Sequence, residues 1–186
     1  MSLWNNFTGH LRTILHHKKL VRRYCFRAGL YKQGIMHDWS KYSPVEFIAG
    51  VKNYQGGVKS PNFGEKKAKG YSSAWLHHKG RNRHHYEYWI DLTLDPSQGL
   101  QGMPMPTRYV VEMFCDRIAA SKNYNKGTYN DSFPLQYYEK NKMHYILHKD
   151  TKDLLERLLH MLADEGEDAV FSYIRKHIDL KHSPKW

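Results

Sequence analysis

The sequence predicts an all-α fold, a single globular helical-bundle domain over residues 1–186. Three observations support this prediction. Apolar residues recur with a period close to 3.6 in three long segments, residues 7–31, 107–124 and 151–165. The stretch Ser43–Glu46 (SPVE) has a serine, a proline and a glutamate at the positions of a helix-capping box. No segment alternates convincingly with the period of a strand, and no internal repeat occurs.

Length and composition narrow the class of protein. The chain of 186 residues fits one domain with its own core. Its longest apolar runs fall short of the ~20 residues that span a bilayer, and Met1–Leu11 lacks the pattern of a secretory signal. Cys25 and Cys115 lie in apolar, helix-like contexts, which favours two buried, reduced thiols. We therefore expect a cytoplasmic protein with no membrane partner.

The chain is strongly basic, with a formal net charge of +11 when histidine is neutral. This charge indicates an anionic partner, which is a nucleotide, a nucleic acid or a phosphorylated metabolite. The densest basic run is Lys59–Arg83. Charge alone would also fit a solvated basic surface, so it does not choose among these partners.

The first helix is expected over Phe7–Tyr31. On it His10, His17 and Tyr24 step by seven and therefore share one face roughly, whereas His16 lies on a neighbouring one. A helix facing the core more often carries a packed histidine than a metal ligand. Only His17 gains support as a ligand, from the residues that follow it along the chain.

The next two segments are expected to be a helix and a loop. The capping box begins a helix that runs to about Tyr54, and it gives Glu46 a capping role outside the functional site. Residues 55–70 are rich in glycine and lysine, and we expect them to form a mobile loop near the site entrance.

Two interpretations compete for Tyr71–Leu94, where helix is expected on both sides of a break near Gly80. The first is a second metal site or a phosphate pocket; its residues are His78, Arg81, Arg83 and His84. The second is a nucleic-acid surface on which aromatic rings stack on bases between cations. Those rings are Trp75, Tyr86 and Trp89.

The remaining elements are a loop at 95–106 and helices at 107–124, about 133–142, 151–165 and from 167 through His177. Gly166 separates the last two. Asp116 lies in mid-helix among apolar neighbours, so it must be paired or bound to something. We expect the helices of residues 132–180 to pack on a metal-site core of about residues 10–125.

The stretch His37–Lys41 (HDWSK) brings together groups that suit a metal and a phosphate. Imidazole nitrogen and carboxylate oxygen suit a borderline or hard divalent cation. The ammonium of Lys41 suits a phosphate oxygen. Other metal-ligating residue types lie along the chain in a fixed order: His17 upstream, and His78, His84, His85 and Asp116 downstream.

This order resembles the HD-domain superfamily of metal-dependent phosphohydrolases, which is all-helical. The resemblance implies that one divalent ion is bound by His17, His37, Asp38 and Asp116. It implies further that His78 and His84 hold a second ion bridged by Asp38, with His77 and His85 as the alternates. The segments HDWSK, AWLHHKGRNRHH and EMFCDRIAASKNY also resemble a small, uncharacterised family of bacterial and phage proteins.

The resemblance implies hydrolysis of a nucleotide or other phosphoester. One or two transition-metal ions (Fe, Mn, Co, Ni or Zn) would lower the pKa of a bound water and supply hydroxide to a phosphorus atom. Asp38 and Lys41 are the expected catalytic residues, and Lys41, Arg81 and Arg83 the expected phosphate-binding ones. The alternatives are a basic nucleic-acid-binding protein with a structural metal, and a metal-binding protein without catalysis.

Overall fold

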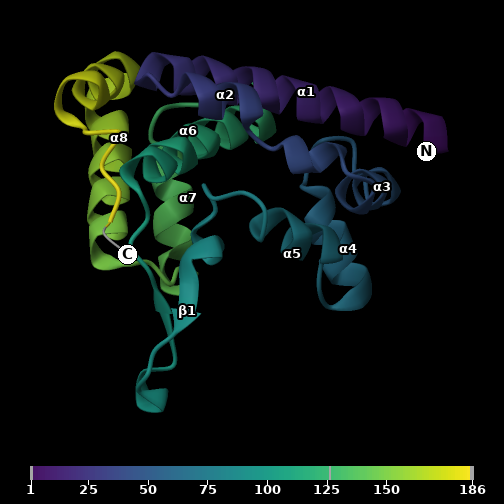
Figure 1. Cartoon of the computed structure of the whole chain (residues 1–186). Helices are drawn as coiled ribbons and strands as arrows, with labels where there is room; N and C mark the ends of the chain where they lie inside the picture. The colour runs from purple at the N-terminus through teal and green to yellow at the C-terminus, as the bar shows by residue number, and fades with distance from the viewer. Residues whose placement is uncertain (1, 126, 185–186) are drawn as a thin grey trace.

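The computed structural model describes residues 2–125 and 127–184, and it confirms the all-α prediction (Figure 1). Within these residues, the α-helices are α1 (Leu3–Ala28), α2 (Tyr31–Met36), α3 (Pro44–Lys52), α4 (Pro61–Lys69), α5 (Ser73–Lys79), α6 (Thr107–Tyr124), α7 (Phe133–Asn141) and α8 (Lys149–His177). Short 3-10 helices are η1 (Trp39–Tyr42), η2 (Tyr86–Trp89), η3 (Pro96–Gln98) and η4 (Lys142–His144). No helix in these two ranges is both long enough and apolar enough to cross a membrane.

The long helix α1 connects the two sides of the molecule. It packs against α2, α6 and α8 toward its C-terminal end and against α3 toward its N-terminal end (Figure 1). The side chain of Ser2 caps its start by accepting a hydrogen bond from the backbone N–H of Asn5. Gly29 ends it in the left-handed conformation, with φ 88°. The helix therefore begins earlier and ends earlier than the predicted Phe7–Tyr31.

The apolar core lies between α1, α6 and α8. Its fully buried side chains include Val21, Tyr24, Val110, Phe114, Ile118, Leu155, Leu158 and Leu162. Helix α6 has the predicted bounds. Gly166 interrupts α8 with a φ of 83°, at the position where the sequence predicted one helix to end and the next to begin. The period of the apolar residues and the position of Gly166 thus predicted the helices that form the apolar core.

The prediction of a loop over residues 55–70 is wrong for its second part, because residues 61–69 form α4. Ser60 caps this helix, and the following proline occupies the first turn, the same serine–proline pair that opens α3. The buried carboxylate of Glu65 then accepts hydrogen bonds from the hydroxyls of Ser72 and Ser73, both at 2.7 Å. These bonds tie α4 to the start of α5.

The helix expected after Gly80 does not form. The side chain of Asn82 donates a hydrogen bond at 2.8 Å to the backbone oxygen of His78, which also accepts from the backbone N–H groups of Arg81 and Asn82 at the end of α5. The chain then turns into η2 and into a hairpin that the sequence did not predict. Its strands are β1 (Ile90–Leu92) and β2 (Leu100–Gly102), antiparallel, with Ile90 opposite Gly102. Figure 1 shows the hairpin extending away from the helices.

Candidate metal centre

The structure brings together the side chains of all six residues that the sequence predicted as metal ligands. They come from α1, the C-terminal end of α2, the end of α5, the turn after it, and α6; the residues are His17, His37, Asp38, His78, His84 and Asp116. Asp38 is at the middle of the cluster and is 1% exposed. Both the α1 side and the α5 side of the molecule therefore meet at this carboxylate.

The backbone of Asp38 explains how two adjacent residues reach the same point. His37 is the C-cap of α2, and Asp38 then takes a left-handed conformation with φ 55° and ψ 31°. Among the residues that the structure describes, it is the one non-glycine residue with positive φ. Aspartate tolerates this conformation better than most residues do, although at some cost in strain. As a result, Nε2 of His37 lies 3.2 Å from Oδ2 of Asp38.

The Oδ2 atom of Asp38 faces a first group of ligand atoms. Nε2 of His17 lies 3.7 Å from it. Oδ1 of Asp116 lies 2.9 Å from Nε2 of His17 and 3.6 Å from Nε2 of His37. The nearest ligand atoms of His17, His37 and Asp116 all lie within 4.8 Å of one another.

The Oδ1 atom of Asp38 faces a second group. Nε2 of His78 lies 3.3 Å from it and Nε2 of His84 lies 3.5 Å from it. A ligand atom of His85 lies within 4.8 Å of the same three side chains. Each oxygen of Asp38 thus faces a different set of histidines, which is the arrangement of a bridging carboxylate.

Glu112 supports two of these histidines from behind, and sequence analysis missed it. Its Oε1 lies 2.9 Å from Nδ1 of His37 and 3.3 Å from Nδ1 of His84. A carboxylate at Nδ1 holds the proton there and leaves the Nε2 lone pair directed toward the centre. The available signal was helical spacing, since Glu112 lies one turn before Asp116 on α6.

Glu46 plays the same part for His78, so its assignment to capping alone is wrong. Ser43 does accept a hydrogen bond from the backbone N–H of Glu46, at 3.4 Å. The Glu46 carboxylate instead lies 2.8 Å from Nδ1 of His78 and 2.7 Å from Nδ1 of His77. No signal in the sequence pointed to this role, because the capping pattern already accounted for a glutamate at that position.

The donor set fits a divalent metal ion. Nε2 of His17, His37 and His84 and Oδ1 of Asp38 are buried and make no hydrogen bond of acceptable geometry within the described residues. Burial of an unsatisfied polar atom costs about 1–3 kcal/mol, so several together need a common partner. Imidazole nitrogens and carboxylate oxygens grouped within 4.8 Å suit an ion that binds them at about 2.0–2.2 Å. These clusters could therefore hold a metal ion.

Lys41 lies at the edge of the cluster. It follows Asp38 by one turn of η1, and its Nζ lies 2.5 Å from Oδ2 of Asp38. Burial lowers the pKa of its ammonium, but the charges of Asp38 and Asp116 outweigh burial and raise that pKa above its usual value. Burial likewise raises the pKa of Asp38, and the charges of His37 and Lys41 lower it well below its usual value. Lys41 is thus a cation beside an ionised carboxylate, and its side chain keeps 30% exposure.

Arg81 and Arg83 lie elsewhere. They line a cavity of about 540 Å³ whose wall includes His37, His84 and Glu112 but neither Asp38 nor Lys41. The sequence analysis expected Lys41, Arg81 and Arg83 to bind one phosphoryl group together. The position of the two arginines in this separate cavity does not support that expectation.

The histidine doublets separate in space. His16 is exposed, whereas His17 is buried in the cluster. His77 contacts Glu46 from outside the centre, whereas His78 faces Asp38. His10 is a packing residue: its ring lies against Phe47 of α3, 5.3 Å between centroids.

The aromatic residues proposed to stack on bases pack within the protein. Trp75 lies against His78 and His85, with ring centroids 5.5 and 4.9 Å apart. Tyr86 packs edge-on against Tyr145 at 5.2 Å. Trp89 donates a hydrogen bond from Nε1 to a backbone oxygen. Each ring thus has a structural role inside the fold.

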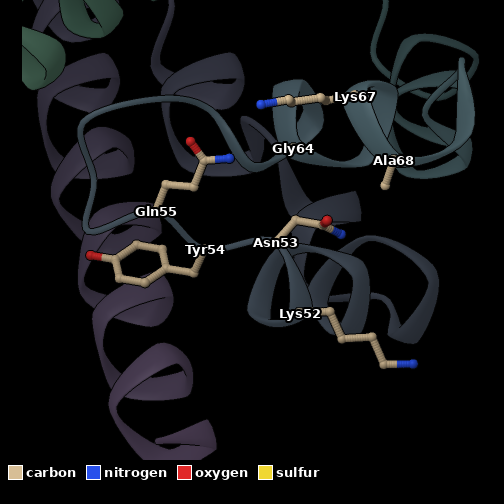
Figure 2. A pocket seen from close by; sticks show the side chains of 7 residues that line it. All are labelled: Lys52, Asn53, Tyr54, Gln55, Gly64, Lys67 and Ala68. Carbon is tan, nitrogen blue, oxygen red and sulfur yellow. The ribbon is translucent and has the colours of Figure 1, made fainter. Parts of the chain in front are cut away.

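A surface hollow of about 460 Å³ lies between the end of α3 and α4 (Figure 2). Its lining residues are Lys52, Asn53, Tyr54, Gln55, Gly64, Lys67 and Ala68. None of them is a histidine or a carboxylate, so this hollow does not belong to the metal centre.

A family model matches residues 6–161, described as a family of unknown function (DUF5662). The chain belongs to this family. No curated protein and no solved structure matches it. The DUF5662 match contains every residue of the candidate metal centre, from His17 to Asp116, together with Glu46, Glu112 and Lys41.

Proposed function

We propose that this DUF5662 protein is a metal-dependent phosphohydrolase with an HD-type site, acting on a nucleotide or another phosphoester. The observation that carries the proposal is the position of Asp38. Its two oxygens face two different sets of histidines, and Lys41 lies beside it at the exposed edge. The order of ligand types along the chain supports the same activity through its resemblance to the HD-domain superfamily.

Each side chain of the centre has a role that follows from its contacts. His17, His37, Asp38 and Asp116 would hold one ion, and His78 and His84 with Asp38 would hold a second. Glu112 and Glu46 orient the histidines by fixing the proton on Nδ1. When bound, a transition metal such as Fe, Mn, Co, Ni or Zn supplies an activated water at neutral pH.

The role of Lys41 distinguishes a catalytic site from a site that only binds metal. The Asp38 carboxylate lies against Nζ of Lys41 and offsets the repulsion between this ammonium and a metal ion. Because 30% of the Lys41 side chain is exposed, its ammonium can also meet a phosphoryl oxygen of the substrate, and it would stabilise the charge that develops there. The net charge of +11 supports attraction of a phosphate-bearing substrate to the protein.

The test is Lys41→Met, measured on metal-loaded protein with p-nitrophenyl phosphate and a panel of nucleotides. We expect turnover to fall by about 100-fold or more, because a charge stabiliser of the transition state is lost. Metal content and the thermal midpoint should stay close to those of the wild type.

The matched control is Lys52→Met, which removes an exposed lysine on α3 that touches no ligand residue. It should leave turnover unchanged. Equal turnover by Lys41→Met and Lys52→Met on every substrate that the wild type cleaves would remove Lys41 from the mechanism. Wild-type protein that carries metal but cleaves none of the panel would contradict the proposed activity.

A further inference from the structure

A second cavity lies behind the metal centre. Its wall includes Glu112 and the Nδ1 sides of His37 and His84, whose Nε2 atoms face Asp38 in the opposite direction. The other lining residues come from α2, the turn after α5, and α6; they are Lys32, Gln33, Met36, Arg81, Asn82, Arg83, Arg108 and Tyr109. The cavity is therefore separated from Asp38 by a layer of two imidazoles.

The charge of this cavity is strongly positive. Four cations line it: Lys32, Arg81, Arg83 and Arg108. Within residues 2–125 and 127–184, no carboxylate oxygen lies within 4.0 Å of a side-chain nitrogen of any of the four, so none of them forms an ion pair. The one carboxylate in the lining, Glu112, is occupied by two histidines. An anion is the partner that this set lacks.

Aromatic rings and a hydroxyl hold two of the guanidinium groups without neutralising them. The Arg108 guanidinium lies over the ring of Tyr109, 4.8 Å from its centroid, and donates a hydrogen bond to the hydroxyl of Ser183 at 3.1 Å. The Arg83 guanidinium lies over the ring of Tyr88 at 5.7 Å. Guanidinium groups held this way are suited to bidentate contacts with phosphate oxygens.

The size of the cavity excludes a lone phosphate as its full occupant. A volume of about 540 Å³ is in the range of small-molecule sites, about 300–1,000 Å³. Cations on three separate elements suit an anion that carries charge at more than one phosphorus atom. The amides of Gln33 and Asn82 add hydrogen-bonding groups, and Met36 adds an apolar wall.

We propose that this cavity binds the diphosphate group of a small molecule, at a site distinct from the metal centre and separated from it by His37, His84 and Glu112. The site goes beyond the proposed hydrolysis and does not depend on it. A ligand here lies beside Glu112, the carboxylate that orients His37 and His84, but it does not reach Asp38 or Lys41.

The experiment is isothermal titration of metal-loaded protein with inorganic pyrophosphate and, separately, with ADP. We expect a binding event for each probe that the wild type and Lys41→Met share, and any further event at the metal centre to be the one that Lys41→Met weakens. The double variant Lys32→Gln/Arg108→Gln should bind at least about tenfold more weakly, because two charge-assisted contacts are lost. Affinity should also fall as salt is raised.

Two controls keep the result specific. Arg157→Gln removes an exposed arginine on α8 and should leave the binding of both probes unchanged. Ser183→Ala removes the hydroxyl that contacts Arg108 but keeps the charge, so it should bind far better than the double variant. Tighter binding of ADP than of pyrophosphate would show that the nucleoside is also contacted, whereas equal binding would show that the diphosphate suffices; both support the site.

Three outcomes would overturn the proposal. One is the absence of binding by either probe at millimolar concentration. Another is binding that Lys41→Met abolishes and the double variant retains, which would put the probe at the metal centre. The third is equal weakening by Arg157→Gln, which would mean attraction by net charge alone. Failure of hydrolysis with pyrophosphate binding intact would reject the proposed function and leave this site standing.

Discussion

Two buried regions meet at α6 and differ in what they contain. The face of α6 toward α1 and α8 carries Val110, Phe114 and Ile118, each with no more than 1% exposure. Another face carries Glu112 and Asp116, which contact histidines of the candidate metal centre. The first region consists of packed apolar side chains, and the second consists of charged and polar side chains that contact one another.

The two regions contribute differently to stability. A fully buried apolar side chain stabilises the fold by about 1.5–3 kcal/mol, and the apolar core needs no further partner. Buried imidazoles and carboxylates cost free energy unless they are paired or bind a metal. The comparison teaches that the apolar core is stable through its own packing, whereas the cluster would gain stability from a bound ion.

The largest expected effect is on metal binding, and it tests the polar side of the comparison. Asp38→Asn removes the charge that both groups of histidines face, so we expect it to lower metal affinity by ~100-fold or more. Wild-type protein, purified without chelator or a nickel column, should carry at least one transition-metal ion per chain by elemental analysis. Asp38→Asn should carry almost none.

The control for that variant is Asp91→Asn, an exposed aspartate on β1. It should keep the wild-type metal content. Full metal content in Asp38→Asn, or none in the wild type, would contradict a metal centre at this cluster.

The next effect tests the apolar side. Leu158→Ala removes a fully buried side chain of α8 and should lower the free energy of unfolding by about 2–5 kcal/mol, through lost burial and a cavity. Chemical denaturation should show the loss both with metal and after chelation, because Leu158 belongs to the apolar core. Leu94→Ala, at an exposed position of the hairpin, should change stability by less than about 0.5 kcal/mol. If Leu158→Ala lowered the free energy of unfolding only in the metal-loaded protein, the two regions would not be independent.

The smallest effect concerns the support behind the metal ligands. Glu112→Gln keeps the size of the side chain but weakens the hydrogen bond that orients His37, so metal affinity should fall by about 10–100-fold. A competition titration with a metal chelator measures this change. Glu139→Gln on the exposed side of α7 is the matched control and should leave the affinity unchanged. Equal affinities of the two variants would mean that Glu112 is a packing residue only.

Much of the fold followed from rules that act over a few residues. The bounds of α6, the start of α3 at Ser43 and the break at Gly166 all depend on side-chain periodicity, capping or glycine within one or two turns. The same rules applied to Ser60 would have identified α4. The hairpin was not predicted, because its short strands show little alternation and its β2 strand depends on contact with another segment: a Cβ at Gly102 would lie 2.6 Å from the backbone nitrogen of His148.

For the candidate site, the sequence by itself determined which residue types are present and in what order, and the resemblance to a known superfamily named six residues that the structure groups together. Only the tertiary structure decided how they are supported and which way they face. The partners of His37 and His78 lie 75 and 32 residues away, at Glu112 and Glu46. The nitrogen that an imidazole presents depends on the hydrogen bond at its other nitrogen, and that partner is chosen by packing between helices rather than by neighbours in the chain. The same packing places Arg81 and Arg83 in the cavity on the Nδ1 side of His37 and His84. Rules that act over a few residues do not predict this position.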